Sequence, residues 1–276
     1  MKFRIPLKGA RVAARVYNPS DAKRSGIEAG WSLARLRHGE SDDSLIGGLR
    51  SICRKMEIEH AFAPDVSKAS ARVITQKEMA GRQIELGSNV FLSFGEESAD
   101  GVFLEKGEAF MMSGRGCPVI IASDSKNVAI VHAGRDSLIY RDAVMDNVGK
   151  ASRPYMSVVD SLIDAFVERE SFPGEMVMAF SIPTAVFEHP LEHPTYGNFN
   201  RALHAFVEKQ WPGNTNICKG SMYLNLEDIF LSQAHRVGVK ASVVHPAGTI
   251  PGMTYPRNSQ ETRNGARNLI IVQRVY

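Results

Sequence analysis

Two short apolar runs, at 118–122 and 128–131, flank the small and polar stretch 123–127. Two apolar runs joined by such a stretch are typical of a β-hairpin. Cys117 directly precedes the first run, and His132 directly follows the second, fifteen positions later. Because the strands of a hairpin are antiparallel, we expect the thiol and the imidazole to lie side by side at its open end. A thiol beside a base is an arrangement that produces a nucleophile.

The composition predicts a packed globular protein. The chain has 276 residues, of which 43% are hydrophobic, and its 33 basic and 30 acidic residues give a formal charge of +3. This near balance argues against nucleic acid, or an anionic membrane, as the main partner.

The sequence lacks signals for export or membrane insertion. The N-terminal residues do not contain the apolar stretch of a signal peptide, and no later window approaches the ~18 uncharged residues of a membrane span. Cys53, Cys117 and Cys218 are widely spaced, which favours neither a disulfide framework nor a cysteine-rich zinc site. We therefore expect a cytoplasmic protein. A secreted effector without a recognisable signal is the alternative.

Hydrophobic periodicity predicts helices and strands in an irregular order. Amphipathic helices are expected at 44–57 (with Asp42 or Asp43 as N-cap), 154–169, 198–209 and 226–237, the last ended by Gly238. Besides the hairpin, strands are expected at 71–75, 89–94, 101–112 (with a turn at 106–107), 176–182, 239–244 and 268–275. No linker divides these elements. We therefore predict a single α+β domain over residues 1–276, with α/β-like layers and a central mixed β-sheet flanked by helices.

A series of short motifs follows the chain at 31–40, 72–84, 98–102, 117–119, 132–134, 231–239, 254–257 and 265–268. In this order they resemble motifs of the YfiH family, also called laccase-domain or multicopper polyphenol oxidoreductase-like proteins. The segment 117–119 is similar to the family's Asp-Cys-x-Pro-Val element, and 132–134 to its His-Ala-Gly-Trp element. The resemblance implies that family's fold. It also implies deamination or phosphorolysis of purine nucleosides, at a metal, often zinc, bound by two histidines and a cysteine.

The metal ligands of that family are incomplete in this sequence. Ala80 stands where the family has its first histidine, Arg135 replaces the tryptophan, and in strict register Gly116 occupies the cysteine position. Catalytic zinc normally has three protein ligands and a water. We therefore predict no metal cofactor. The alternative is zinc on Cys117 and His132, with His38 or His60 as candidates for the third ligand.

A second resemblance covers only residues 90–140. The segment 113–117, followed fifteen residues later by His132-Ala133-Gly134, is similar to the Ser-Gly-Cys and His-Thr-Gly motifs of the cytotoxic necrotizing factor catalytic domain. That family deamidates a glutamine of a Rho GTPase with a metal-free Cys–His pair, and a backbone carbonyl orients its histidine. The resemblance implies catalytic roles for Cys117 and His132, and an orienting role for the carbonyl of Leu92 or Ser93.

The neighbours of the pair suggest how a substrate is held. Gly114 and Gly116 leave room beside the thiol, and the backbone N–H groups of that turn are candidates for stabilising an oxyanion. Arg135, Arg257 and Arg267 are candidates for binding a phosphate or a ribose, because a guanidinium binds oxyanions through paired hydrogen bonds.

The other cysteines and a pair of histidines have structural explanations. Cys53 lies on the apolar face of its predicted helix, and Cys218 lies in a loop. His189 and His193 are four residues apart, but the proline after each of them prevents the helix that would align them on one metal. We interpret this segment as a structural loop.

Three functional hypotheses remain. The first is a Cys–His enzyme that breaks a C–N bond in a small-molecule substrate, either a purine nucleoside or a related small amide. The second is a necrotizing-factor-like deamidase with a protein substrate. The third is a non-catalytic binding protein that has kept the fold.

Overall fold

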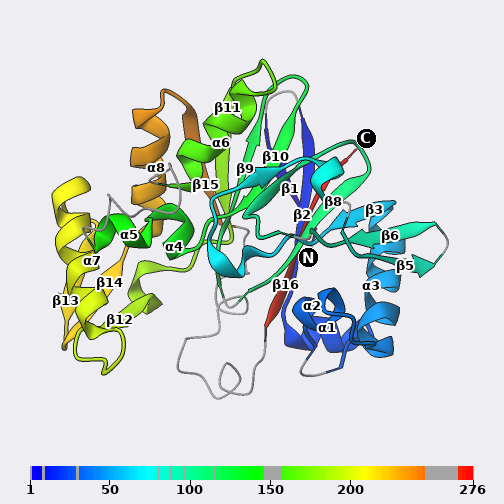
Figure 1. The fold of residues 1–276 in the computed structure, drawn as a ribbon, viewed down its shortest axis with the longest axis horizontal. Coiled ribbons are helices and arrows are strands. Elements are labelled where there is room, and N and C mark those ends of the chain that lie inside the picture. The colour runs from blue at the N-terminus through cyan, green and yellow to red at the C-terminus, as the bar shows by residue number, and fades with distance from the viewer. Residues whose placement is uncertain are drawn as a thin grey trace.

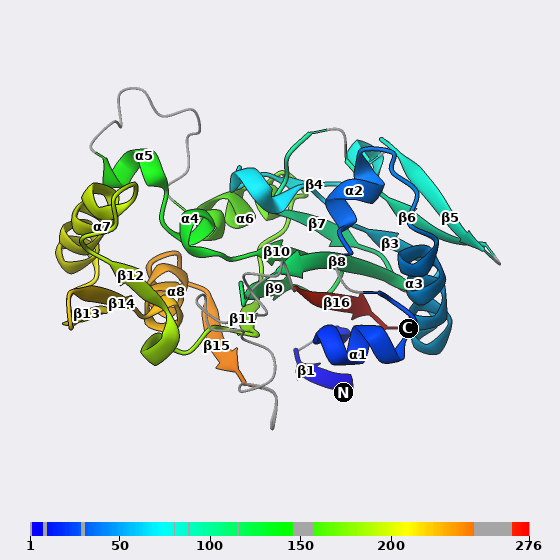
Figure 2. The ribbon, with the colours of Figure 1, turned by 90° about the horizontal axis from the view of Figure 1, so that it is seen from below.

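The computed structural model describes residues 2–7, 10–28, 31–79, 81–87, 89–95, 97–114, 116–145, 157–245 and 267–275. In these residues two large β-sheets pack against each other, and helices cover their outer faces (Figures 1 and 2). The order of layers is therefore helices, sheet, sheet, helices.

The first sheet has seven strands and holds both ends of the described chain. In spatial order its strands are β1 (Lys2–Pro6), β2 (Arg11–Tyr17), β16 (Asn268–Arg274), β8 (Glu108–Gly114), β3 (His60–Phe62), β6 (Val90–Ser93) and β5 (Gln83–Gly87). Only β3 pairs in parallel with its neighbours, so the sheet is mixed.

The second sheet has six strands and contains the hairpin predicted from the sequence. Its order is β15 (Lys240–Val244), β11 (Glu175–Ala179), β9 (Val119–Ser123), β10 (Val128–His132), β7 (Gly101–Leu104) and β4 (Val73–Ile74). A smaller sheet, in the order β12 (Glu188–Pro190), β14 (Ser221–Leu224) and β13 (Thr215–Cys218), lies at one end of the molecule (Figure 2).

Each helix packs with its apolar side on one of these sheets. The helices α1 (Pro19–Arg24), α2 (Leu33–Arg37) and α3 (Asp43–Met56) join the apolar cluster on the outer face of the seven-stranded sheet. The helices α4 (Arg135–Leu138), α6 (Val158–Val167) and α8 (Leu226–Arg236) pack on the six-stranded sheet. The helix α7 (Gly197–Gln210) packs on the small sheet, and α5 (Arg141–Val144) contacts α7 (Figure 1).

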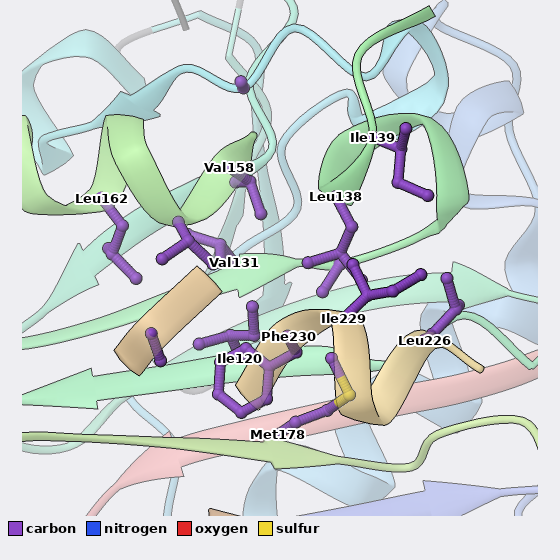
Figure 3. Packing of buried hydrophobic residues seen from close by; sticks show 14 of the residues in the cluster. Ile120, Val131, Leu138, Ile139, Val158, Leu162, Met178, Leu226, Ile229 and Phe230 are labelled. Atoms are coloured by element: carbon purple, nitrogen blue, oxygen red, sulfur yellow. The ribbon is translucent and has the colours of Figure 1, made fainter. Parts of the chain in front are cut away.

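The hairpin β9–β10 is buried on both faces, which makes it a rigid base for the residues at its ends. Every residue of both strands is buried. On one side Ile121 and Ile130 contribute to the core between the two sheets. On the other side Ile120 and Val131 pack against α6 and α8, as Figure 3 shows. Strands buried on both faces carry continuous apolar runs, and this explains the two runs in the sequence.

Most of the elements predicted from periodicity are confirmed. The four predicted helices correspond to α3, α6, α7 and α8, although residues 154–156 lie outside the described chain. Asp42 is the N-cap of α3, where its side chain accepts a hydrogen bond from the N–H of Leu45 at 2.9 Å. Gly238 follows α8 with a φ of +75°, a conformation that favours glycine. The α+β fold class is confirmed as well.

Two details of the predicted fold are wrong. One central sheet was expected, but the strands form two large sheets. The single strand expected at 101–112 is in fact β7 and β8, and the turn around Gly107 passes the chain from one sheet to the other. Local periodicity shows that a segment is extended, whereas the choice of sheet depends on distant partners. The sequence analysis also missed β1, β2 and the small sheet.

None of the helices in the described residues is both long enough and apolar enough to cross a membrane.

Candidate active site

Cys117 and His132 meet at the open end of the hairpin, as its sequence pattern predicted. His132 is the last residue of β10 and pairs with Val119, the first residue of β9. The N–H of Ala133 donates to the carbonyl oxygen of Pro118 at 2.9 Å, so the pairing continues to the residue next to Cys117. The thiol is half-buried, and His132 is 8% exposed.

The thiol and the imidazole are in contact through a hydrogen bond. The Nδ1 atom of the ring is bound elsewhere, so Nε2 faces the sulfur. Gly134 provides the space for this contact. A Cβ atom added there would lie 2.7 Å from Nε2 of His132 and 3.6 Å from Sγ of Cys117. Any larger residue at position 134 would therefore displace the ring from the sulfur.

Asp100 completes a row of three side chains behind the imidazole. It is fully buried, and its Oδ1 lies 3.0 Å from Nδ1 of His132. Since a carboxylate only accepts, Nδ1 is the donor in this bond. Ser137 donates its hydroxyl to the same carboxylate oxygen at 2.9 Å, and the N–H of Ala71 donates to the other oxygen. The carboxylate therefore has three donors in a fully buried position.

The prediction that the Leu92 carbonyl orients His132 is wrong. Leu92 lies in β6 of the other sheet, where it pairs with Ala61 on one side and Ile84 on the other. The carbonyl oxygen of Ser93, its alternative, accepts from the N–H of Ala63 at 2.9 Å. The group that holds His132 is the side chain of Asp100. Asp100 was visible in the sequence as the acidic residue of the 98–102 motif, but no local pattern indicates that it reaches a histidine 32 positions away.

Two backbone features hold Asp100 in place. Gly101 opens β7 and lies against β10 so closely that an added Cβ would be 2.4 Å from the carbonyl oxygen of Ile130. This contact lets the N–H of His132 donate to the carbonyl oxygen of Asp100 at 2.7 Å. On the other side, Ala71 adopts a φ of +55°, which is uncommon for a residue other than glycine, and directs its N–H at the carboxylate.

The surroundings favour the protonated form of the imidazole. Burial alone would lower the pKa of His132, but the hydrogen bonds to Asp100 and to Cys117, together with their charges, outweigh it and raise the pKa from 6.5 to about 10. An imidazolium beside a cysteine stabilises the thiolate. At neutral pH the arrangement thus favours a thiolate and imidazolium pair backed by a carboxylate.

A cavity of about 550 Å³ opens in front of the pair. Its wall includes four predicted site residues besides Cys117 and His132, namely Gly114, Gly116, Arg135 and Arg267. Gly116 has a φ of +114°, a conformation that favours glycine, whereas a Cβ added to Gly114 would meet the Cβ of Cys117 only at an ordinary contact distance of 3.9 Å. Arg257 and Ala80 lie outside the described residues.

Other lining residues were not identified from the sequence. Arg37 of α2 and Asp65, from the segment after β3, are among the lining residues on the side of the seven-stranded sheet. Arg135 is bound on three sides: by Asp136, by Nδ1 of His189 at 3.3 Å, and by the ring of Phe199 at 4.9 Å. His189 is buried against Phe187 and contacts Arg135, and it lies in β12, so the loop expected around it is wrong at this residue.

The described residues do not fit a catalytic zinc. All eight histidines and all three cysteines of the chain lie within them, yet nowhere in them do three His, Cys, Asp or Glu side chains converge as metal ligands. The ring of His60 bonds to Ser93 and stacks on Phe62, and neither His60 nor His38 belongs to a group of three possible ligands in the described residues. Cys117 and His132 alone are one ligand short of the usual three.

Comparisons with known proteins identify the fold. No protein-family model matches the sequence, and no curated protein matches it. Solved structures do match over nearly the whole chain. The hypothetical protein YfiH of Bacillus licheniformis has a TM-score of 0.59 at 12% identity, covering 99% of each chain. The chain has the YfiH fold.

Two further solved structures agree with the YfiH protein. YlmD of Geobacillus stearothermophilus has a TM-score of 0.59 at 13% identity, with 98% of this chain and 93% of that chain covered. NMB0706 of Neisseria meningitidis, a DUF152 protein, has a TM-score of 0.55 at 12% identity, with 100% and 99% covered. The YfiH fold confirms the resemblance seen in the sequence motifs. At this level of identity it says nothing about the chemistry, which has to be inferred from the site.

Proposed function

We propose that this protein is a cysteine-dependent hydrolase that breaks a C–N bond in a small amide or amidine, a class that includes the aminopurine ring of a nucleoside. The observation that carries the proposal is the row Asp100, His132 and Cys117, which ends on a half-exposed sulfur at a cavity. A nucleophile, a base in contact with it and a third group that orients the base are the signature of nucleophilic catalysis.

The reaction begins with attack of the Cys117 thiolate on the amide or amidine carbon, which forms a C–S bond. His132 then gives its Nε2 proton to the leaving nitrogen as the C–N bond breaks, and ammonia or an amine departs. In the second half, His132 takes a proton from water, the hydroxide attacks the thioester or thioimidate carbon, and the C–S bond breaks. The thiolate and imidazolium are thereby restored.

Asp100 has a positioning role in this scheme. It accepts from Nδ1, so it fixes which nitrogen faces the sulfur and stabilises the charge on the ring. The glycine-rich turn at Gly114 and Gly116 lies beside the thiol, where backbone N–H groups are suited to bind the oxyanion of the intermediate. Cys117 and His132 carry every bond-making and proton-transfer step of this scheme.

The experiment is to incubate the purified protein with a panel of small amides and amidines, including adenosine, and to measure ammonia release. Wild-type protein is expected to release ammonia from at least one compound and to pass through a covalent adduct at Cys117, detectable by mass spectrometry. The variants Cys117→Ala and His132→Ala are expected to release none, while Cys218→Ala, at an exposed thiol far along the chain, keeps the activity.

Deamidation of a protein glutamine is a second candidate, because the Cys–His spacing matches that of the necrotizing-factor catalytic domain. A mass gain of about one dalton on a protein glutamine, dependent on Cys117, would select it. If neither small compounds nor protein glutamines react, and no adduct forms, the third hypothesis of a binding protein without catalysis is favoured.

A further inference from the structure

One stretch of backbone lies both on the cavity wall and against the buried carboxylate behind His132. It is the segment 63–72, which joins β3 to β4 and which we call the wall segment. Its first five residues line the cavity in front of Cys117. Near its other end the N–H of Ala71 donates to the carboxylate of Asp100. A displacement of the wall would therefore reach the group that holds the imidazole.

The wall segment is tied to the backbone around Asp100 at two separate points. The carbonyl oxygen of Asp65 accepts from the N–H of Ala99 at 3.2 Å. The carbonyl oxygen of Arg72 accepts from the N–H of Asp100 at 2.8 Å. Between these two points the side chain of Asp100 accepts from the N–H of Ala71. The conformation of the wall segment therefore determines where both the backbone and the carboxylate of Asp100 lie.

The backbone between these points adopts a conformation that local preferences do not maintain. Ala69 has a φ of +46° and Ala71 a φ of +55°, and Ala71 is fully buried. A positive φ is uncommon for a residue other than glycine, and residues in such conformations persist only where surrounding contacts hold them. The wall segment therefore depends for its shape on groups that lie outside it.

Arg37 of α2 is such a group. Its Nη1 lies 3.0 Å from Oδ1 of Asp65, and its Nη2 donates to the carbonyl oxygen of Ala63 at 3.1 Å. The guanidinium lies over the ring of Phe94 at 5.7 Å, and the side chain of Arg37 is 15% exposed. The neighbouring Leu36 is buried in the apolar cluster on the seven-stranded sheet, so α2 is itself fixed. Because a guanidinium is planar, it binds its two acceptors in a fixed geometry.

We propose that Arg37 is a positioning residue for the reactive Cys117 and His132 pair. By holding the wall segment, it keeps the N–H of Ala71 on the carboxylate of Asp100, and that carboxylate keeps the imidazole turned toward the sulfur. The inference rests on the proposed function, in which the thiolate is the nucleophile and the imidazolium is its acid. Arg37 acts in this scheme through the backbone of the wall segment and not on the reacting atoms.

The ion pair of Arg37 and Asp65 separates this positioning role from an effect of charge across the cavity. If charge alone acted on the thiolate, loss of the Arg37 cation would disfavour the thiolate, whereas loss of the Asp65 anion would favour it. Loss of positioning has the same sign for both residues, because either variant releases the wall segment from α2. The direction of the change in Asp65→Ala therefore decides between the two effects.

The experiment measures the rate at which iodoacetamide alkylates Cys117 across the pH range. In both Arg37→Gln and Asp65→Ala we expect the rate at neutral pH to fall about three- to tenfold and to rise with pH, because the imidazolium is no longer held against the thiolate. The combined variant should be about as slow as the slower single variant, because both changes break one contact. The matched control is Arg35→Gln, which removes the same charge from the same helix at an exposed position paired with Glu40, and its profile should be that of the wild-type protein.

The other two thiols of the chain provide internal standards in the same sample. Cys53 is fully buried, so its alkylation reveals a variant that has not folded. Cys218 is exposed and gives the rate of a thiol outside the cavity. If Arg37→Gln does not fold, the direction of the change in Asp65→Ala still decides.

An unchanged profile in a folded Arg37→Gln variant overturns the proposal, as does an unchanged or faster reaction in Asp65→Ala. Failure of the proposed function has different results. If Cys117 of the wild-type protein reacts no faster than Cys218, the nucleophile and its positioning residue are refuted together. If Cys117 is activated and the two variants slow it, but no compound releases ammonia, the hydrolase is refuted and the role of Arg37 is confirmed.

Discussion

Replacement of Asp100 by asparagine removes the charge of the buried carboxylate and keeps its shape. The rise in the pKa of His132 from 6.5 to about 10 corresponds to roughly 5 kcal/mol in favour of the imidazolium. Asp100 and Cys117 share this stabilisation. Because the hydrogen bond to Asp100 is the first of the contributions that raise this pKa, Asp100→Asn lowers the pKa of His132 back toward its ordinary value of 6.5. The imidazolium is then no longer held at neutral pH, and the stabilisation of the thiolate is lost with it.

The assay is the rate at which iodoacetamide alkylates Cys117 across the pH range, followed by mass spectrometry. In the wild-type protein the rate should change little through neutral pH, because the thiolate is already formed. In Asp100→Asn the rate at neutral pH should fall by about tenfold to a hundredfold and then rise about tenfold per pH unit, as for an ordinary thiol. Only the thiolate reacts, so this profile reports the protonation state directly.

The matched control is Asp124→Asn in the turn at the other end of the hairpin. Asp124 also accepts hydrogen bonds, from the side chains of Asn127 and Ser171, but it has no contact with the imidazole. Its replacement should leave the alkylation profile of Cys117 unchanged. If Asp100→Asn reacts like the wild-type protein at every pH, the charge of Asp100 does not act on the pair and the reasoning is refuted.

Four further outcomes follow from the same geometry. Gly134→Ala should slow alkylation of Cys117 about a hundredfold by displacing the ring, whereas Gly174→Ala, whose Cβ would meet nothing nearer than 3.8 Å, should not. Ser137→Ala removes one donor from Asp100 and should lower turnover about three- to tenfold, with partial rescue by Ser137→Thr. Turnover needs a proton on His132, so the turnover rate should fall on the basic side with a midpoint near pH 10. A midpoint close to pH 6.5 in the measured pH–rate profile would contradict the ion pair. Phe230→Ala in the core should lower the free energy of unfolding by about 4 kcal/mol in a denaturant titration, with an unchanged alkylation rate for the folded protein.

The hairpin and its pair of reactive residues could be predicted because their signals are local. The two apolar runs and the polar turn fix the strand pairing, and the pairing fixes which ends meet. The helices α3, α6, α7 and α8 were equally visible, because each carries an apolar stripe at helical spacing. In all these cases the residues that determine the structure lie within about sixteen positions of one another.

The groups around Cys117 and His132 could not be predicted, because they are brought there by contacts between segments that are distant in the sequence. Asp100 reaches His132 only because β7 lies beside β10, and that pairing depends on the close approach permitted by Gly101. Arg37 and Asp65 reach the cavity only because a second sheet packs on the first. The orienting role assigned to Leu92 followed a resemblance in the necrotizing-factor domain, and it failed because β6 belongs to the other sheet.

The ultraviolet absorbance of the thiolate tests the central claim most directly, because it needs neither a substrate nor a reagent. The measurement is the difference between wild-type protein and Cys117→Ala, titrated from acidic to basic pH. The account predicts that the thiolate signal is already present at neutral pH and that it disappears there in His132→Ala. A difference spectrum that develops only near the ordinary thiol pKa of about 8.5, alike with and without His132, would contradict it.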